Sequence, residues 1–106
     1  MNSYSAVLVT CPDLKEARKI ARLLLTSKLA ACVNIVPHAE SHYWWQGKIE
    51  SAKEVLLIIK TKRTLMNRLI EKVKSAHSYT VPEVIALRID QGSRAYLKWM
   101  DQSLSH

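Results

Sequence analysis

The sequence has no phenylalanine and only two glycines, Gly47 and Gly92, among its 106 residues. Phosphate-binding loops of the Walker type and dinucleotide-binding fingerprints each need several clustered glycines, so neither can be built here. An acylphosphatase-like loop is excluded for the same reason. An RNA-recognition domain needs aromatic residues on its central strands, whereas the corresponding segment, residues 54–61, reads EVLLIIKT.

Cysteines and long apolar runs are also scarce. Cys11 and Cys32 are a single pair with no Cys-x-x-Cys spacing, so we expect reduced thiols rather than a disulfide scaffold. No window approaches the roughly 20 apolar residues of a membrane span, and residues 1–4 lack the features of a secretory signal. We therefore expect a cytoplasmic protein with no membrane partner. The hydrolase motifs G-x-S-x-G and H-E-x-x-H are absent as well, and we predict that the protein is not an enzyme.

The charge is unbalanced, with 16 Lys and Arg against 9 Asp and Glu and a net charge of +7. Such an excess favours nucleic acid, anionic lipid or acidic ligands, but charge alone does not choose among them. Four basic residues share the outer face of the first predicted helix: Lys15, Arg18, Lys19 and Arg22. We interpret this face as solvated and expect no nucleic-acid partner, with a charge-driven nucleic-acid binder as a third alternative.

The apolar patterns predict a single domain, residues 1–106, with the order β-α-β-β-α-β and an added C-terminal helix. Residues 5–10, 30–36 and 83–89 are β-branched or apolar runs typical of strands. Asp13 followed by Glu16 resembles a capping box before the first helix, and Ser93 can cap the last one. This order is the ferredoxin-like split βαβ arrangement, an α+β fold with an antiparallel sheet and helices on one face.

Residues 41–61 predict a β-hairpin that is too long for its domain. Gly47-Lys48 is the only glycine-containing break between its two arms. As one strand, residues 49–61 would reach roughly 43 Å, against roughly 17–20 Å for a typical strand. The run Val55 to Ile59 is apolar on both alternating faces, which predicts cover by helices or by a partner subunit on each side. We expect an oligomer, in which a charged residue at Ile58 disrupts folding and assembly together.

Four segments together resemble the CutA divalent-cation tolerance family. They are residues 29–37 (LAACVNIVP), 41–50 (SHYWWQGKIE) with Glu54 and the following LLIIKT, 77–87 (HSYTVPEVIAL) and 96–99 (YLKW). The resemblance implies a tight homotrimer related in architecture to the P-II signalling proteins, and a role in tolerance of copper and other divalent cations. Ser78 stands where the family tends to show proline, and Ala76 where some members carry a second histidine, which argues against a metal site built from paired histidines.

The predicted topology places Cys11 and His77 at the same end of the domain. A thiolate with an imidazole suits Cu(I) or Zn(II) better than Mg(II) or Ca(II). Two ligands are too few for a closed structural site, so we expect weak binding of copper or another divalent cation that folding does not require. The alternative is that Cys11 packs as a small apolar residue and His77 caps the end of the second helix.

A second candidate site is a ligand-binding cleft between subunits. We expect Tyr79 and Glu83 to line it, with Lys60 or Tyr43 contributed by a neighbouring copy, while packing of Tyr79 is the alternative. The leading interpretation is a homotrimeric protein of the metal-ion response. The other is a P-II-like signalling or interaction scaffold that binds a small ligand in inter-subunit clefts.

Overall fold

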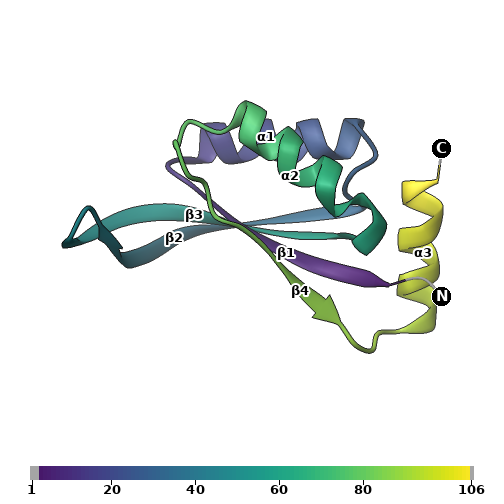
Figure 1. Ribbon diagram of the computed structural model, residues 1–106. Coiled ribbons are helices and arrows are strands. Elements are labelled where there is room, and N and C mark those ends of the chain that lie inside the picture. The colour runs from purple at the N-terminus through teal and green to yellow at the C-terminus, as the bar shows by residue number, and fades with distance from the viewer. Residues whose placement is uncertain (1–2, 106) are drawn as a thin grey trace.

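The computed structural model describes residues 3–105, and its seven main elements follow the predicted order. The strands are β1 (Tyr4–Cys11), β2 (Cys32–Trp45), β3 (Lys48–Lys62) and β4 (Val84–Ile89). The helices are α1 (Leu14–Thr26), α2 (Met66–Ala76) and α3 (Arg94–Leu104), and a 3-10 turn, η1 (Arg63–Leu65), leads into α2. The strands form one antiparallel sheet in the order β2-β3-β1-β4 (Figure 1). The predicted α+β fold is confirmed.

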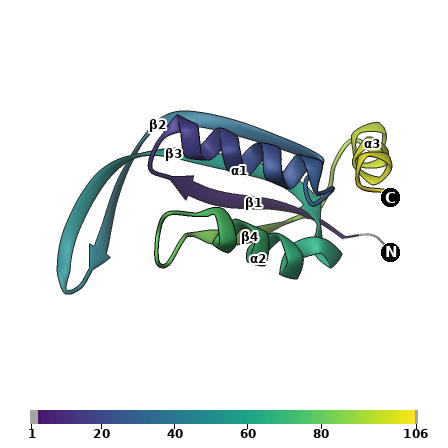
Figure 2. The same ribbon diagram turned by 90° about the horizontal axis from the view of Figure 1, so that it is seen from above.

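Helix α1 begins at the predicted capping box. The Asp13 carboxylate accepts a hydrogen bond from the Glu16 backbone N–H at 2.8 Å. Helices α1 and α2 lie side by side over one face of the sheet, whereas α3 lies beyond the end of the sheet near the two termini (Figures 1 and 2). The core fills the space between these two helices and the sheet, and its fully buried members include Val7, Val9, Ile20, Leu24, Leu57, Ile59, Leu69 and Val73. Within residues 3–105, none of the helices has the length and apolar character needed to cross a membrane.

Strands β2 and β3 continue past the rest of the sheet as a long hairpin (Figure 1). The molecule is 44 Å long but only 25 and 23 Å across, as the predicted strand length requires. The turn consists of Gln46 and Gly47, one residue earlier than the break named from the sequence. Their φ angles are +51° and +79°, and Trp45 pairs with Lys48, which is the geometry of a type I′ hairpin turn.

Pro37 lies within β2 rather than at its end. The strand accommodates it with a register shift between Val36 and Ala39, and His38 adopts a φ of +67° there. Because β2 is an edge strand, the missing proline N–H disrupts no central ladder.

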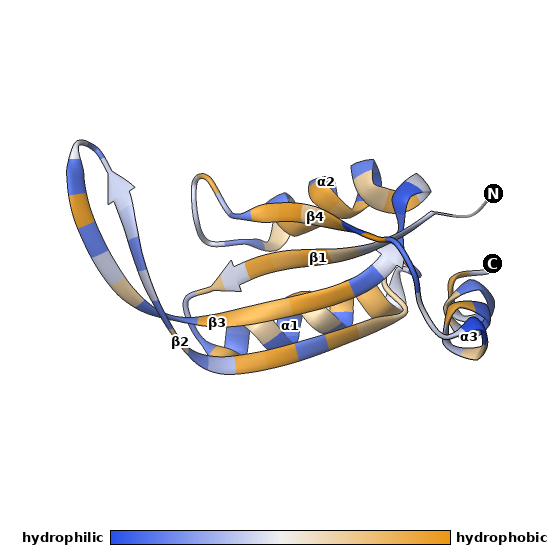
Figure 3. Ribbon diagram, turned by 90° about the horizontal axis from the view of Figure 1, so that it is seen from below, coloured by the Kyte–Doolittle hydropathy of each residue, from blue (hydrophilic) through white to orange (hydrophobic). Residues whose placement is uncertain are grey.

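The two faces of the sheet differ in what covers them. Val55, Leu57 and Ile59 point toward α1 and α2 and are buried. On the opposite face, cross-strand pairing aligns Asn34, Ile58, Leu8 and Ile85 in one row. Neither α1 nor α2 covers this face, and hydrophobic residues occur along all four strands (Figure 3). Its outer members remain exposed within one chain: Val36 by 41%, Ile85 by 51% and Leu87 by 54%.

Candidate functional site

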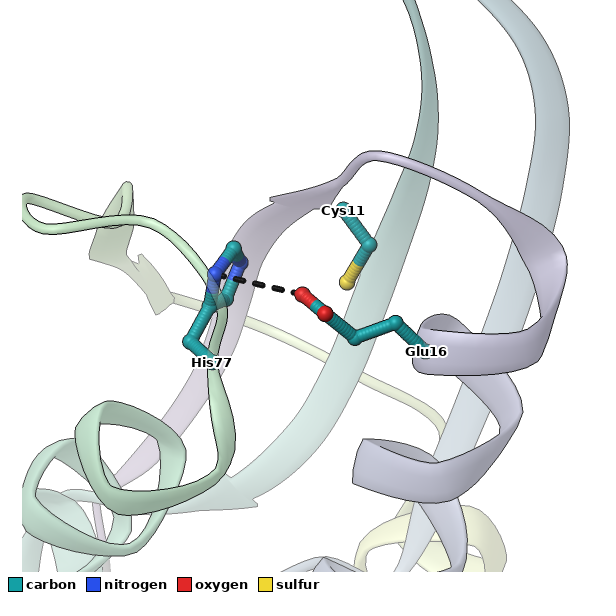
Figure 4. Close-up of side chains that lie close together, drawn as sticks. All are labelled: Cys11, Glu16 and His77. Carbon is teal, nitrogen blue, oxygen red and sulfur yellow. Dashed lines mark ion pairs between the residues drawn. The ribbon is translucent and has the colours of Figure 1, made fainter.

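Cys11, Glu16 and His77 converge where β1 meets the loop after α2 (Figure 4). Their sulfur, carboxylate oxygen and ring nitrogen atoms all lie within 4.8 Å of one another. The sequence predicted the proximity of Cys11 and His77 from topology but missed Glu16. The capping box could have indicated Glu16. A glutamate three residues after the N-cap lies in the first turn of the helix, and this turn is next to the end of the strand that carries Cys11.

Glu16 does not complete the capping box with its own side chain. Its Oε2 atom instead accepts hydrogen bonds from the Ser78 backbone N–H at 3.3 Å and the Ser78 hydroxyl at 3.1 Å. The same oxygen lies 3.3 Å from Nδ1 of His77. Glu16 therefore ties α1 to the α2–β4 loop, and Ser78, a departure from the family pattern, donates both hydrogen bonds.

The ring of His77 is fully buried, and both of its nitrogens have protein partners. Nε2 lies 2.7 Å from the Thr10 carbonyl oxygen, and Nδ1 lies 3.0 Å from the Tyr79 backbone N–H. Because a carbonyl only accepts and a backbone N–H only donates, these partners assign the proton to Nε2. His77 is the residue that ends α2, yet its ring bonds to β1 and to its own loop. A metal ion at Nδ1 has to displace the Tyr79 N–H.

The Cys11 thiol is fully buried and belongs to the hydrophobic core. Burial, and then the nearby carboxylates of Glu16, Asp13 and Glu54, raise the pKa of Cys11 to about 12. The thiol is therefore protonated at neutral pH, and a metal ion can bind its sulfur only by displacing that proton. Each unit by which the pKa of Cys11 is raised makes the free energy of metal binding less favourable by about 1.36 kcal/mol. This cost keeps the binding weak and favours a metal ion with a high affinity for thiolate.

A groove of about 890 Å³ lies between the hairpin and the α2–β4 loop. It is lined by Thr10, Glu40, Ser41, His42, Tyr43, Trp44, Trp45, Glu54, Ser78, Tyr79, Thr80, Val81, Pro82 and Glu83. Three of the predicted cleft residues, Tyr43, Tyr79 and Glu83, thus meet within one chain. Lys60 is not among the lining residues.

Lys60 lies toward the other end of β3, where it pairs with Ala6 and Cys32. Its ammonium group donates a hydrogen bond to the Asn34 side chain. A contribution of Lys60 to the cleft of a neighbouring copy stays a prediction.

Glu54 and Tyr79 form the polar centre of the groove. The Tyr79 hydroxyl donates a hydrogen bond to Oε2 of Glu54 at 2.8 Å. Burial, followed by this hydrogen bond, raises the pKa of Tyr79, so the hydroxyl keeps its proton. Burial, and then the charge of Glu54, raise the pKa of Glu83. Glu54 is only 8% exposed, so the groove holds a nearly buried carboxylate beside a second acid.

These features define a class of protein: α+β subunits with a four-stranded antiparallel sheet, a hairpin that outreaches the domain and a helix-free apolar face. The family profile described as "CutA1 divalent ion tolerance protein" matches residues 5–103. The chain belongs to this family, as the resemblance in the sequence indicated.

Relatives and solved structures agree with that assignment. "Protein CutA" of Mus musculus is 51% identical over 100 residues, which are 94% of this chain and 56% of the mouse protein. The chain thus spans little more than half the length of that curated relative. CutA1 of Oryza sativa superposes with a TM-score of 0.93 at 48% identity, covering 95% of this chain and 93% of the other. The protein of Archaeoglobus fulgidus described as a periplasmic divalent cation tolerance protein superposes with a TM-score of 0.92 at 42% identity, covering 99% and 100%.

Proposed function

We propose that this chain forms a cytoplasmic homotrimer that contributes to tolerance of divalent metal ions and binds copper or a similar cation weakly. The observation that supports the metal site is the convergence of Cys11, Glu16 and His77 within 4.8 Å. Glu16 supplies the third ligand that the pair predicted from the sequence lacked. The proposal includes no catalysed reaction and no cofactor required for folding.

Binding at this cluster requires three local changes. Cys11 loses its proton, His77 releases the Tyr79 N–H from Nδ1, and Glu16 turns its carboxylate away from Ser78. Each change breaks a favourable arrangement of the metal-free protein, so the net affinity is lower than for a site whose ligands are free. Three protein donors also leave a coordination position open, which suits a cation that exchanges rather than a structural ion.

The homotrimer is supported by the helix-free face of the sheet. Isolated apolar side chains are normal on a surface, but contiguous apolar rows mark an interaction surface. Val36, Ile85 and Leu87 are exposed there in one chain, and the flanking strands β2 and β4 are both sheet edges. Packing of these faces between copies of the chain would bury the exposed apolar side chains and cover the edge strands.

Copper(I) competition against a chelator tests the metal site. We would carry out the titration in a Cys32→Ser background, because Cys32 is a free and more accessible thiol, and thiolates are good ligands for Cu(I). Adding Cys11→Ser or His77→Ala is expected to weaken binding at least tenfold, and adding Glu16→Gln to weaken it less. Thermal unfolding without metal shows whether each variant is folded. Equal affinity in all four proteins overturns the site.

The groove supports a second candidate function, a P-II-like signalling or interaction scaffold that binds a small ligand. Tyr43, Tyr79 and Glu83 line it within one chain and leave it open to a neighbouring copy. Ligand binding that persists in the metal-free Cys11→Ser protein favours this function over metal tolerance.

A further inference from the structure

The groove between the hairpin and the α2–β4 loop is acidic on a strongly basic protein. The chain carries a net charge of +7, yet the lining residues include three glutamates and no lysine or arginine. Glu40 has a partner in His42, whose Nε2 lies 2.8 Å from its carboxylate. Glu54 and Glu83 have no such basic partner among the lining residues, so the electrostatic complement of the groove is a cation.

Among residues 3–105, a donor reaches one oxygen of Glu54 and not the other. Oε2 accepts the Tyr79 hydroxyl, and no other hydrogen bond or ion pair reaches this carboxylate from residues 3–105. No fully buried side-chain oxygen or nitrogen in the described part of the chain lacks a hydrogen-bond partner, so Oε1 keeps some access to solvent, and Glu54 is one of the residues that line the groove. Because the residue is otherwise 92% buried, Oε1 is an acceptor that either water or a ligand donor in the groove can satisfy.

The walls of the groove are aromatic. Tyr43, Trp44 and Trp45 line it from the hairpin and are 42%, 73% and 46% exposed, and Tyr79 faces them from the α2–β4 loop. Aromatic faces attract organic cations such as ammonium groups through the quadrupole of the ring, whereas Mg(II) and Ca(II) take oxygen ligands. Aromatic walls around a carboxylate acceptor therefore fit an alkylammonium ion better than a hard metal ion.

We propose that this groove binds an aliphatic polyamine. One ammonium group donates to the free oxygen of Glu54 and is balanced by Glu83, while the methylene chain lies against Tyr43 and Trp45. The inference rests on the second candidate function, that the groove is a ligand site, and not on the cluster of Cys11, Glu16 and His77.

The test is a titration of the intact, assembled protein with spermidine at ~150 mM salt, a concentration that screens non-specific surface attraction. Binding is measured by calorimetry and by tryptophan fluorescence, because Trp44 and Trp45 lie in the groove. We expect saturation, with affinity at least tenfold weaker in both Glu54→Gln and Glu83→Gln. The matched control is Glu71→Gln, which removes an exposed acid on α2 outside this groove and should leave the affinity unchanged. Equal affinity in all variants, or displacement of spermidine by equimolar Mg(II), overturns the proposal.

A second probe separates the ligand class from the groove itself. The anionic aromatic dye anilinonaphthalene sulfonate is titrated into the wild type and Tyr43→Leu. Dye binding that requires Tyr43, without spermidine binding, refutes the polyamine and retains the groove as a ligand site. Binding of neither probe refutes both the polyamine and the second candidate function.

Discussion

Replacing Ile58 by aspartate is the sharpest test of the assembly. Ile58 lies in the centre of the helix-free face, between Asn34 of β2 and Leu8 of β1 in the same cross-strand row. It is half-buried within one chain, so an aspartate there remains partly hydrated as long as the face is open. Once three copies pack these faces together, the same carboxylate has to leave water.

The expected cost differs between folding and assembly. Within one chain, the substitution loses part of the burial of one isoleucine, on the order of 1 kcal/mol. Against a packed apolar partner, an unpaired carboxylate costs several kcal/mol, and about 4 kcal/mol already weakens association roughly a thousandfold. Since this cost recurs at every copy of the interface, we expect the trimer to be lost at micromolar concentration. If the separated chain is unstable, folding is lost together with the trimer, as we expect from the sequence.

Sedimentation velocity with circular dichroism measures both effects. The wild type should sediment as three copies of the 12.1 kDa chain, and Ile58→Asp as smaller species. The control is Leu25→Asp, which places the same charge on the outer helix α1, where Leu25 is 42% exposed. That change should cost about 0.5 kcal/mol through its position near a helix C-terminus and should leave assembly intact. A soluble, fully assembled Ile58→Asp protein, or a wild type that stays monomeric, contradicts the reasoning.

Three further substitutions test the groove and the hairpin. Tyr79→Phe removes the donor to the nearly buried Glu54 and should lower the free energy of unfolding by about 1.5–3 kcal/mol in urea titrations, whereas an unchanged value would mean that water replaces the hydroxyl. The pKa of Glu83 is raised above its ordinary 4.5, so its contribution to stability is present below that pH and is lost as pH rises through the folded-state pKa. Glu83→Gln should therefore gain in melting temperature relative to the wild type from pH 4 to 7, and parallel curves would contradict the raised pKa. Gly47→Ala should lower the free energy of unfolding by about 1–2 kcal/mol, because an L side chain is strained at a φ of +79°. No atom lies within 4 Å of the added methyl group, so a clash contributes nothing to this cost. A neutral effect in thermal unfolding would show that the turn relaxes.

Much of the fold is predictable from sequence because its signals are local. The Asp13 cap, the apolar run from Val55 to Ile59 and the turn glycine Gly47 each act within a few residues. The sequence placed the turn one residue too late, because Gln46 adopts a positive φ and glutamine has no particular preference for that conformation. A proline in a strand is consistent with a bulge, an edge or a break, and only the register shows that β2 continues past Pro37 with a shift between Val36 and Ala39.

The candidate sites were less predictable because their key contacts are not local. Glu16 had a sufficient local explanation as part of a capping box, which concealed its contacts with Ser78 and His77, 62 and 61 positions further along the chain. Glu54 sits at the end of an apolar run and is typical of a strand that emerges into water. Its burial depends on Tyr79, 25 positions away. The place of Lys60 in a cleft depends on a second copy of the chain, which no pattern within one sequence specifies.

The loop from His77 to Glu83 connects the two candidate sites physically. His77 faces the helix side of β1 and bonds to Thr10 and the Tyr79 N–H, while the Tyr79 hydroxyl reaches Glu54 in the groove. The two rings also pack against each other, with centroids 4.7 Å apart. A cation that takes Nδ1 of His77 must release the Tyr79 N–H, and the backbone that carries this N–H also positions the hydroxyl bound to Glu54. The metal cluster and the groove therefore share one segment of backbone, and we expect occupation of the cluster to change the position of the Tyr79 hydroxyl in the groove.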